Sequence, residues 1–259
     1  MTNAFDLTGK VALVTGGTRG IGFAMAEALV TAGANVVIWG SDEARAGTAA
    51  DRLKGRGGQV HGQAVDVADE AAVVTGMIDS IAVFGRLDAV FANAGLAGQS
   101  IAFLDSRGEE LEAILAVNTA GAYFTLREAC RHMVARAEAG DRGGSLVAVG
   151  SVGTERGMPR FQPYAASKGA LQPLIRSIVA EHSKHGIRAN LIQPGFIETD
   201  MTDHFRASAN VNEAILRRVP QRRWGRPADF GGIAVYLASD ASAFHTGDTL
   251  VIDGGYLVS

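Results

Sequence analysis

Short apolar runs alternate with longer amphipathic stretches along almost the whole chain. The first run, Lys10–Thr15, is rich in β-branched residues and ends at a glycine, which is typical of a buried strand. The stretch that follows it has apolar residues at helical spacing and predicts a helix over Gly20–Ala32. Continued along the chain, this pattern predicts seven strands, over Lys10–Thr15, Asn35–Trp39, Val60–Val67, Asp88–Asn93, Ser145–Gly150, Arg188–Ile192 and Thr249–Ile252.

Helical patterns lie between these strands, over Gly20–Ala32, Glu43–Leu53, Asp69–Phe84, Glu109–Ala137, Pro163–His185 and Pro227–Ser239. Strands that are apolar throughout and are separated by helices indicate a parallel sheet that is covered on both faces. Crossovers in such sheets are right-handed. We therefore predict an α/β fold of the doubly wound type, with a seven-stranded parallel sheet between two layers of helices.

No internal repeat or linker interrupts the pattern, so residues 1–259 are expected to form a single domain. The longest irregular segment is Phe196–Arg226, which is polar and is predicted to hold one or two short helices at most. In open α/β sheets, ligands bind beyond the carboxyl ends of the strands. Because this segment follows the sixth strand, we expect it to form a lid over a substrate site.

Composition narrows the classes of function. The 259 residues carry a net charge of −3 with no block of like charges, so nucleic acid is not an expected partner. The single cysteine, Cys130, excludes an internal disulfide and gives no thiol pair for a metal, and we expect it to be a buried helix residue. The start of the chain lacks a signal-peptide pattern, and no apolar run approaches the ~18 residues that span a bilayer. We expect a cytoplasmic protein without a metal or a membrane contact.

A glycine-rich turn, Thr15–Gly22, connects the first strand to the first helix. Its spacing is G-x-x-x-G-x-G, which differs from the commoner G-x-G-x-x-G pattern of dinucleotide-binding proteins. Glycines at this place let the backbone approach a pyrophosphate, which then lies at the N-terminus of the helix. A tight connection without a ligand is the alternative, but the position between strand and helix favours dinucleotide binding.

Four further groups of candidate residues lie beyond the glycine-rich turn. Asn93-Ala94-Gly95 ends the fourth strand and by itself is equally compatible with a plain turn. Ser151 follows the fifth strand, and Asn118 lies within a predicted long helix. Tyr164 and Lys168 stand four residues apart at the start of another helix, which places them on one face. A Tyr and a Lys at that spacing occur by chance in many helices, but here they share a sheet edge with Ser151.

Taken together, these residues resemble the short-chain dehydrogenases/reductases in their single-domain form. The resemblance covers the whole chain and rests on the motifs Thr15–Gly22, Asp66-Val67, Asn93-Ala94-Gly95, Asn118, Ser151, Tyr164, Lys168, Pro194-Gly195 and Asp253-Gly254-Gly255. It implies a Rossmann fold that binds NAD(P) and an oxidoreductase that interconverts a ketone and a secondary alcohol. It also implies a homo-oligomer, expected to be a tetramer, that pairs through the helices at Glu109–Ala137 and Pro163–His185 and through the C-terminal strand.

The resemblance assigns catalytic roles to four residues, Asn118, Ser151, Tyr164 and Lys168. Tyr164 is expected to be the general acid/base, because the Lys168 ammonium and the oxidised nicotinamide would favour the phenolate and lower its pKa. Ser151 would orient the carbonyl oxygen, Lys168 would also hold the nicotinamide ribose, and Asn118 would anchor a water relay. The expected cofactor-binding residues are Gly16, Thr18, Arg19, Gly20, Ile21, Gly22, Ser41, Asp66, Val67, Asn93, Ala94, Gly95, Tyr164, Lys168, Pro194, Gly195, Ile197 and Thr199.

The end of the second strand bears on the choice between NADP and NAD. NAD-binding relatives carry an Asp there that binds the adenosine ribose, whereas this chain has Gly40. Arg19 and Ser41 are suited to bind a 2′-phosphate, so NADP is favoured over NAD. Asp42 or Glu43 could turn inward to the ribose instead, although the exposed start of a helix is the simpler interpretation. Asp66-Val67 is similar to the pair that contacts adenine.

The substrate pocket is expected to be lined by Val152–Phe161 and Phe196–Arg226, with Met158, Phe161, Phe196 and Phe205 as apolar walls. Glu155, Arg156 and His204 could bind a polar group. Five arginines, Arg217, Arg218, Arg222, Arg223 and Arg226, either attract a phosphorylated acyl carrier or, as we favour, are surface or subunit-contact residues. The substrate stays open between a 3-oxoacyl thioester and a sugar, polyol or small alcohol. The alternative function is a catalytically silent NAD(P)-binding regulator or scaffold, against which the intact tetrad argues.

Overall fold

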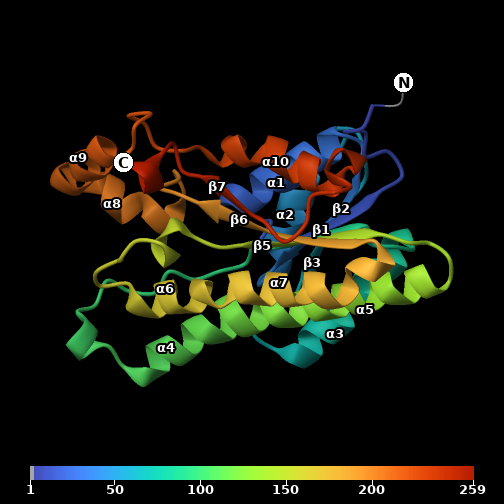
Figure 1. Cartoon of the computed structure of the whole chain (residues 1–259), viewed down its shortest axis with the longest axis horizontal. Coiled ribbons are helices and arrows are strands. Elements are labelled where there is room, and N and C mark those ends of the chain that lie inside the picture. Colours follow the sequence, from blue (N-terminus) through green and yellow to red (C-terminus); the bar gives the residue numbers. More distant parts are fainter. Residues whose placement is uncertain (1–2) are drawn as a thin grey trace.

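The strands form one parallel sheet. The structure is a computed structural model that describes residues 3–259. Seven strands pair side by side in the order β3-β2-β1-β4-β5-β6-β7 (Figure 1). Their bounds are β1 Val11–Thr15, β2 Asn35–Gly40, β3 Val60–Ala64, β4 Ala89–Ala92, β5 Gly144–Val149, β6 Ile187–Pro194 and β7 Thr249–Ile252. The order reverses between β1 and β4, where a crevice opens at the carboxyl ends of the strands. The predicted doubly wound fold is confirmed.

Helices cover both faces of the sheet (Figure 1). One layer holds α1, α2 and α10, and the other holds α3, α5 and α7, with α4 and α6 next to them. The helices are α1 Gly20–Thr31, α2 Glu43–Leu53, α3 Glu70–Phe84, α4 Gly108–Leu115, α5 Ala122–Glu138, α6 Gln162–Gly169, α7 Leu171–His182, α8 Asp203–Ala207, α9 Ala209–Arg218 and α10 Gly231–Ala238. The short helices α8 and α9 lie at one end of the molecule, beside the C-terminus (Figure 1).

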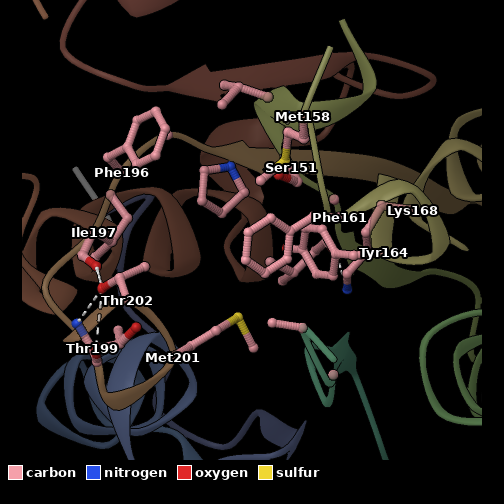
Figure 2. Close-up of a pocket in the computed structure, with 18 of the residues that line it drawn as sticks. Ser151, Met158, Phe161, Tyr164, Lys168, Phe196, Ile197, Thr199, Met201 and Thr202 are labelled. Carbon is pink, nitrogen blue, oxygen red and sulfur yellow. Dashed lines mark hydrogen bonds between the residues drawn. The ribbon is translucent and has the colours of Figure 1, made fainter. Parts of the chain in front are cut away.

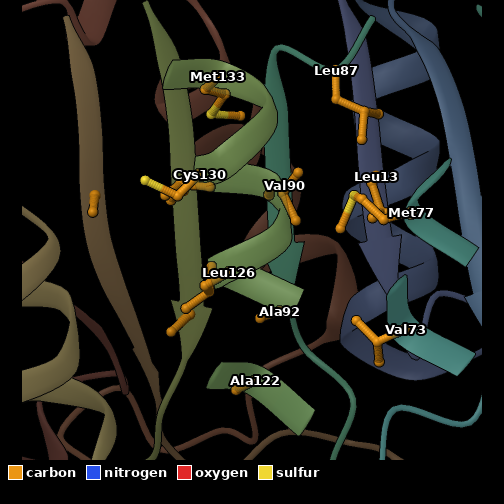
Figure 3. Close-up of a cluster of buried hydrophobic side chains, with 14 of the residues drawn as sticks. Leu13, Val73, Met77, Leu87, Val90, Ala92, Ala122, Leu126, Cys130 and Met133 are labelled. Carbon is orange, nitrogen blue, oxygen red and sulfur yellow. The ribbon is translucent and has the colours of Figure 1, made fainter. Parts of the chain in front are cut away.

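Two cores result, because side chains on a strand point alternately to its two faces. On β1, Leu13 packs towards α3 and α5 while its neighbour Val14 packs towards α1 and α10. Figure 3 shows the first core, in which Leu13 and Val90 of the sheet meet side chains of the helices such as Met77 and Leu126. These side chains are fully or almost fully buried. The sheet edge that carries the site is thus fixed by packing from both sides.

Two predicted long helices are interrupted. The stretch predicted as a helix over Glu109–Ala137 contains a π-helical turn, Ala116–Gly121, between α4 and α5. The stretch over Pro163–His185 breaks at Ala170 into α6 and α7 and ends in a 3₁₀ turn. Pro173 accounts for the break, because it has no N–H to donate to the carbonyl of the preceding turn.

The end of the third strand also differs from prediction. Strand β3 ends at Ala64 rather than Val67, because the Asp66 carboxylate accepts a hydrogen bond from Ala68 N (3.0 Å) and closes a turn. Segment 196–226 contains two α-helices, α8 and α9, preceded by a 3₁₀ turn at Asp200–Thr202. The prediction of one or two short helices in this segment is confirmed.

Candidate active site

The glycine-rich turn after β1 is braced by Asn93. The Asn93 amide donates to the carbonyls of Thr15 (3.0 Å) and Gly16 (3.2 Å), and the Thr15 hydroxyl accepts from the backbone N–H groups of Asn93 and Ala94. Gly16 has a φ of +61°, and a Cβ on Gly22 would lie 2.4 Å from the Gly16 carbonyl oxygen and 2.5 Å from the Asn93 amide nitrogen. Glycine is thus required at both positions for the backbone to turn this tightly.

Helix α1 begins inside this turn and has no side-chain cap. Its first backbone N–H groups therefore have no acceptor from the chain at the helix start. Such a helix end, at the crevice between β1 and β4, fits the pyrophosphate of a dinucleotide. The motif predicted from sequence thus has the backbone geometry that its proposed ligand needs.

Ser151, Tyr164 and Lys168 line one cavity at the carboxyl edge of the sheet (Figure 2). Ser151 follows β5, and the other two residues lie one turn apart on α6. The Lys168 ammonium is buried and donates to the carbonyl of Val149 at the end of β5 (2.7 Å). A Cβ on Gly95, which follows β4, would lie 3.3 Å from the Lys168 nitrogen. The ends of β4 and β5 thus converge on the residues predicted to be catalytic.

The pKa of Tyr164 differs from expectation. Desolvation raises the pKa of the Tyr164 phenol, and a hydrogen bond with Ser151 acts in the opposite direction. Burial lowers the pKa of Lys168 to about 8. The expected lowering of the Tyr164 pKa by Lys168 is not found in the protein alone, because that ammonium is itself desolvated and donates to a backbone carbonyl.

Asn118 lies in the π-helical turn rather than in regular helix, and it is fully buried. Its carbonyl oxygen accepts from Leu96 N (2.7 Å), and its amide donates to Leu96 O (2.8 Å) and to the Ser167 hydroxyl (2.9 Å). Ser167 in turn donates to the backbone carbonyl of Tyr164 (2.7 Å). Asn118 therefore ties the loop after β4 to the helix that carries Tyr164.

Ser167 was missed by the sequence analysis, although it belongs to the motif that holds Tyr164 and Lys168. It is fully buried, and besides donating to Tyr164 its own carbonyl accepts from the Thr119 hydroxyl (2.9 Å). The available signal was a small polar residue three positions after Tyr164, on a helix that starts at the sheet edge. Such a residue reaches the backbone carbonyl of the preceding turn.

The predicted cofactor residues divide into two groups. Those that line the cavity, with the catalytic ones, are Ile21, Asn93, Gly95, Ser151, Tyr164, Lys168, Pro194, Gly195, Ile197 and Thr199. Those that lie outside its lining are Gly16, Thr18, Arg19, Gly20, Gly22, Ser41, Asp66, Val67, Ala94 and Asn118. The Val67 side chain is buried in the core, so that only its backbone is available to a ligand. The cavity thus corresponds to the nicotinamide and substrate end of the expected site.

The end of β2 lacks a free carboxylate. Asp42 caps α2 by accepting from Arg45 N (2.8 Å), and Glu43 accepts from Ala64 N at the end of β3 (3.1 Å). Neither acid turns towards the crevice, so the alternative ribose acceptors are engaged elsewhere. Arg19 extends across the crevice to the Asp200 carboxylate (2.6 Å), and both side chains are about two-thirds exposed.

The substrate end of the cavity is mostly apolar. Met158, Phe161, Phe196 and Phe205 line it as predicted, and Met201 and Tyr256 join them (Figure 2). Of the three predicted polar residues, only Arg156 lines the cavity. Glu155 is exposed, and the His204 ring packs on Phe205 with a centroid distance of 3.9 Å.

The five arginines of segment 196–226 do not line the cavity. Arg217 pairs with Glu213 and Arg223 pairs with Asp229. Arg222 donates to the Arg217 carbonyl, and the Arg218 guanidinium lies 4.8 Å from the centre of the Tyr256 ring. These contacts are local, and acidic side chains neutralise two of the five arginines, Arg217 and Arg223.

Across residues 3–259, no helix has both the length and the apolar character that a membrane span needs.

Comparison with known proteins places the chain in context. The family model described as "Enoyl-(Acyl carrier protein) reductase" matches residues 16–257. The chain is 36% identical to the 2-dehydro-3-deoxy-D-gluconate 5-dehydrogenase of Pseudoalteromonas atlantica over 99% of both chains. It is 33% identical to the 3-oxoacyl-[acyl-carrier-protein] reductase of Chlamydia pneumoniae over 96% of this chain and 97% of that one. The crystal structure of a gluconate 5-dehydrogenase from Burkholderia cenocepacia, in complex with NADP and tartrate, aligns with a TM-score of 0.93 at 34% identity, covering 99% of this chain and 98% of that one.

Proposed function

Because this chain belongs to the short-chain dehydrogenase/reductase family, we propose that it uses NADP(H) to interconvert a ketone and a secondary alcohol on a small polyhydroxylated substrate. That it is an NAD(P)-dependent oxidoreductase acting on CH–OH groups follows from the family. The observation that carries the proposal is the convergence of Ser151, Tyr164 and Lys168 on one cavity next to an uncapped helix N-terminus.

In the reduction direction, Tyr164 donates its phenolic proton to the carbonyl oxygen while Ser151 holds that oxygen by a hydrogen bond. When bound, NADPH supplies the hydride. Lys168 would hold the nicotinamide ribose, and its charge favours the phenolate that remains after the proton is transferred. Asn118 is a positioning residue. Its buried amide binds the loop after β4 and, through Ser167, the backbone of Tyr164. Oxidation of the alcohol uses the same groups in reverse.

The cofactor is proposed to be NADP rather than NAD. The turn at 16–22 takes the pyrophosphate, and Arg19 and Ser41 bind the 2′-phosphate. Support comes from Gly40, which offers no carboxylate, and from Asp42 and Glu43, which are held by backbone N–H groups. Structural relatives from Burkholderia cenocepacia and two other bacteria are described with NADP bound. Residues 1–259 serve as one NAD(P)-binding domain, in which segment 196–226 is the substrate lid.

The second candidate substrate, a 3-oxoacyl thioester on a carrier, is less well supported. A relative of similar identity has that activity by name. However, a phosphorylated carrier needs a basic surface at the cavity entrance, and Arg217 and Arg223 are paired with acidic neighbours.

A homotetramer is proposed as the working assembly. Support comes from a groove between α5 and α7, lined by apolar residues with charges of both signs beside them. A surface that carries both signs can match a second copy of itself across a two-fold axis. Exposed apolar residues near the C-terminal strand, Phe244, Val251 and Val258, offer a second contact.

The proposal is tested by Tyr164→Phe. This substitution removes the proton donor and leaves the ring in place, so we expect turnover to fall by about 10²–10⁴ while NADPH affinity stays nearly unchanged. Ketone-dependent NADPH oxidation and cofactor titration measure the two quantities. Tyr123→Phe, at an exposed tyrosine outside the cavity, is the control and should behave as wild type. Turnover close to wild type in the Tyr164 variant would show that another group moves the proton.

A further inference from the structure

Two loops at the carboxyl edge of the sheet contribute to the cavity lining. Segment 96–107 follows β4 and supplies Ala97, and segment 152–161 follows β5 and supplies Met158 and Phe161 (Figure 2). Apart from one 3₁₀ turn in each, the two segments belong to no strand or helix. The width of the cavity between them therefore depends on direct contacts that join the two loops.

Arg160 makes such contacts with both its side chain and its backbone. Its Nε donates to the Ser100 hydroxyl (3.0 Å), and its Nη2 donates to the Ser100 carbonyl (3.1 Å). In the opposite direction, the Arg160 carbonyl accepts from Ile101 N (3.1 Å). We call these three hydrogen bonds the Arg160 bridge. One residue of the loop after β5 thus holds two consecutive residues of the loop after β4.

The backbone of Arg160 lies in the left-handed region, with a φ of +71°. Within residues 3–259, Arg222 is the only other residue besides glycines with a positive φ. Glycine adopts this conformation freely, whereas a Cβ makes it unfavourable. An arginine held in such a conformation therefore points to a use for its side chain. The two bonds to Ser100 are the use that the structure shows.

The bridge lies next to residues that face the cavity. Phe161 directly follows Arg160 and is buried, and its N–H donates to the Met158 carbonyl (3.1 Å), which closes a turn. The Phe161 ring also packs against Phe205 of segment 196–226, with a centroid distance of 5.4 Å. A shift of Arg160 would therefore move Phe161 and Met158 relative to Ala97 on the other loop.

Tyr164 and Lys168 are held by contacts that do not involve Arg160. The Tyr164 carbonyl accepts from Ser167, whose hydroxyl accepts from Asn118, and Lys168 donates to the end of β5. Loss of the Arg160 bridge should thus disturb the substrate wall and leave the proton-transfer groups in place.

We propose that Arg160 is a positioning residue for substrate binding. By joining the two loops, it holds Met158 and Phe161 at the separation from Ala97 that the substrate requires. The cavity wall is then formed before the ketone arrives, so that binding does not have to order it. This inference rests on the proposed function, and it adds a residue outside the cavity that controls KM.

The test compares Arg160→Gly with the wild type, using 5-keto-D-gluconate and L-sorbose as ketones and NADPH as cofactor. Glycine keeps the left-handed backbone and removes the two bonds to Ser100. We expect KM for the ketone to rise by about threefold to tenfold, with kcat within about twofold of wild type and NADPH affinity unchanged. Arg160→Lys, whose single ammonium can reach the Ser100 carbonyl, should recover part of the loss.

Ser100→Ala tests the bridge from the other loop and separates it from the flexibility that glycine adds. It removes the hydroxyl acceptor and keeps the carbonyl, so we expect KM to rise by about twofold. In the Arg160→Gly background it should add nothing, because the donor to that hydroxyl is already absent. Arg107→Met is the matched control at an exposed arginine of the same loop, whose side chain makes no capping bond to α4, and should behave as wild type.

Amide hydrogen exchange of the protein without cofactor gives a readout that needs no substrate. Exchange in segment 96–107 should be faster in Arg160→Gly, whereas exchange in α7 should not change. Unchanged exchange in that segment, a wild-type KM in Arg160→Gly, a loss confined to kcat, or additive effects of the Arg160 and Ser100 substitutions overturns the role of Arg160. A wild type that reduces neither ketone with either cofactor overturns the proposed function itself, and with it the role in substrate binding.

Discussion

Arg19 illustrates how an exposed residue can have two partners. In the protein alone it pairs with Asp200 of segment 196–226, 2.6 Å away. A pair with both side chains about two-thirds exposed contributes at most ~1 kcal/mol, since solvent screens it. A phosphate offers the same guanidinium two negative oxygens in bidentate geometry, which is the stronger contact. Asp200 is therefore a competitor for the residue that is proposed to bind the 2′-phosphate.

This competition leads to paired expectations. Arg19→Ala should weaken NADPH binding by about tenfold to a hundredfold, because a charge-assisted contact is lost, and should leave NADH binding nearly unchanged. Asp200→Asn should tighten NADPH binding by at most about fivefold, since it releases the guanidinium from a pair worth ~1 kcal/mol or less. Fluorescence titration of both cofactors at low salt measures these changes. Equal effects on NADH and NADPH would remove Arg19 from the 2′-phosphate site.

Individual residues of the site could be predicted from the sequence where they follow strands. Parallel strands bring their carboxyl ends to one edge, so Asn93, Ser151 and Tyr164 were expected to lie together, and the structure places all three on one cavity. Ser167 was missed although its bond to the Tyr164 carbonyl is local, whereas its contact with Asn118 joins segments remote in sequence and could not be predicted. The same holds for the ionisation of Tyr164, which is set by desolvation in the folded site.

At the scale of elements, the sequence pattern located every strand. The five inner strands are largely buried, whereas the edge strands β3 and β7 are only partly buried, and turns bound all seven. The pattern did not locate the breaks within long helices. Pro173 was visible in the sequence, but a helix pattern continues through it on both sides. The π-helical turn at Ala116–Gly121 has no comparable marker, since it is stabilised by the burial of Asn118 against Leu96 and Ser167.

The junction between β2 and α2 gives a prediction about cofactor choice. A Cβ on Gly40 would lie 2.6 Å from the Thr18 methyl group, in the glycine-rich turn. Gly40→Asp alone should therefore displace the turn and weaken both cofactors. The double variant Gly40→Asp, Thr18→Ala removes the clash and leaves a carboxylate near the ribose, so we expect NADH to gain on NADPH by about tenfold or more, ~1.4 kcal/mol. Titration of NADH and NADPH into Gly40→Asp, the double variant and Thr18→Ala measures this preference, with Thr18→Ala as the control. A single variant that switches preference without loss of affinity would contradict the steric argument.

At the scale of the whole molecule, one of the two helix layers carries an apolar groove on its surface. Between α5 and α7 runs a groove whose lining includes Leu126, Val134, Leu174 and Ile178. Apolar surface of this kind is stabilised when a second copy covers it. The groove lies on the layer opposite α1 and α10, so an assembly through it leaves the cavity end of the molecule accessible (Figure 1).

A charge placed in this groove should therefore break the assembly. In Ile178→Glu we expect a lower mass by light scattering at micromolar concentration, because a half-buried site at a subunit contact cannot solvate a carboxylate. Ile78→Glu is the matched control, since Ile78 is exposed on α3 and outside the groove. Circular dichroism confirms that both variants keep the fold. A wild-type protein with a monomeric mass would refute the proposed tetramer.

The π-helical turn also limits how the length of the chain can change during evolution. Each residue of a helix advances by about 100°, so loss or gain of one residue between Ala116 and Gly121 would rotate one flank against the other. Either Asn118 would leave Leu96 and Ser167, or the side chains of α5 would leave the core beside Val90. We expect insertions and deletions among natural variants to avoid this helix and to collect in surface loops. Point substitutions on its outer face are free of that restriction.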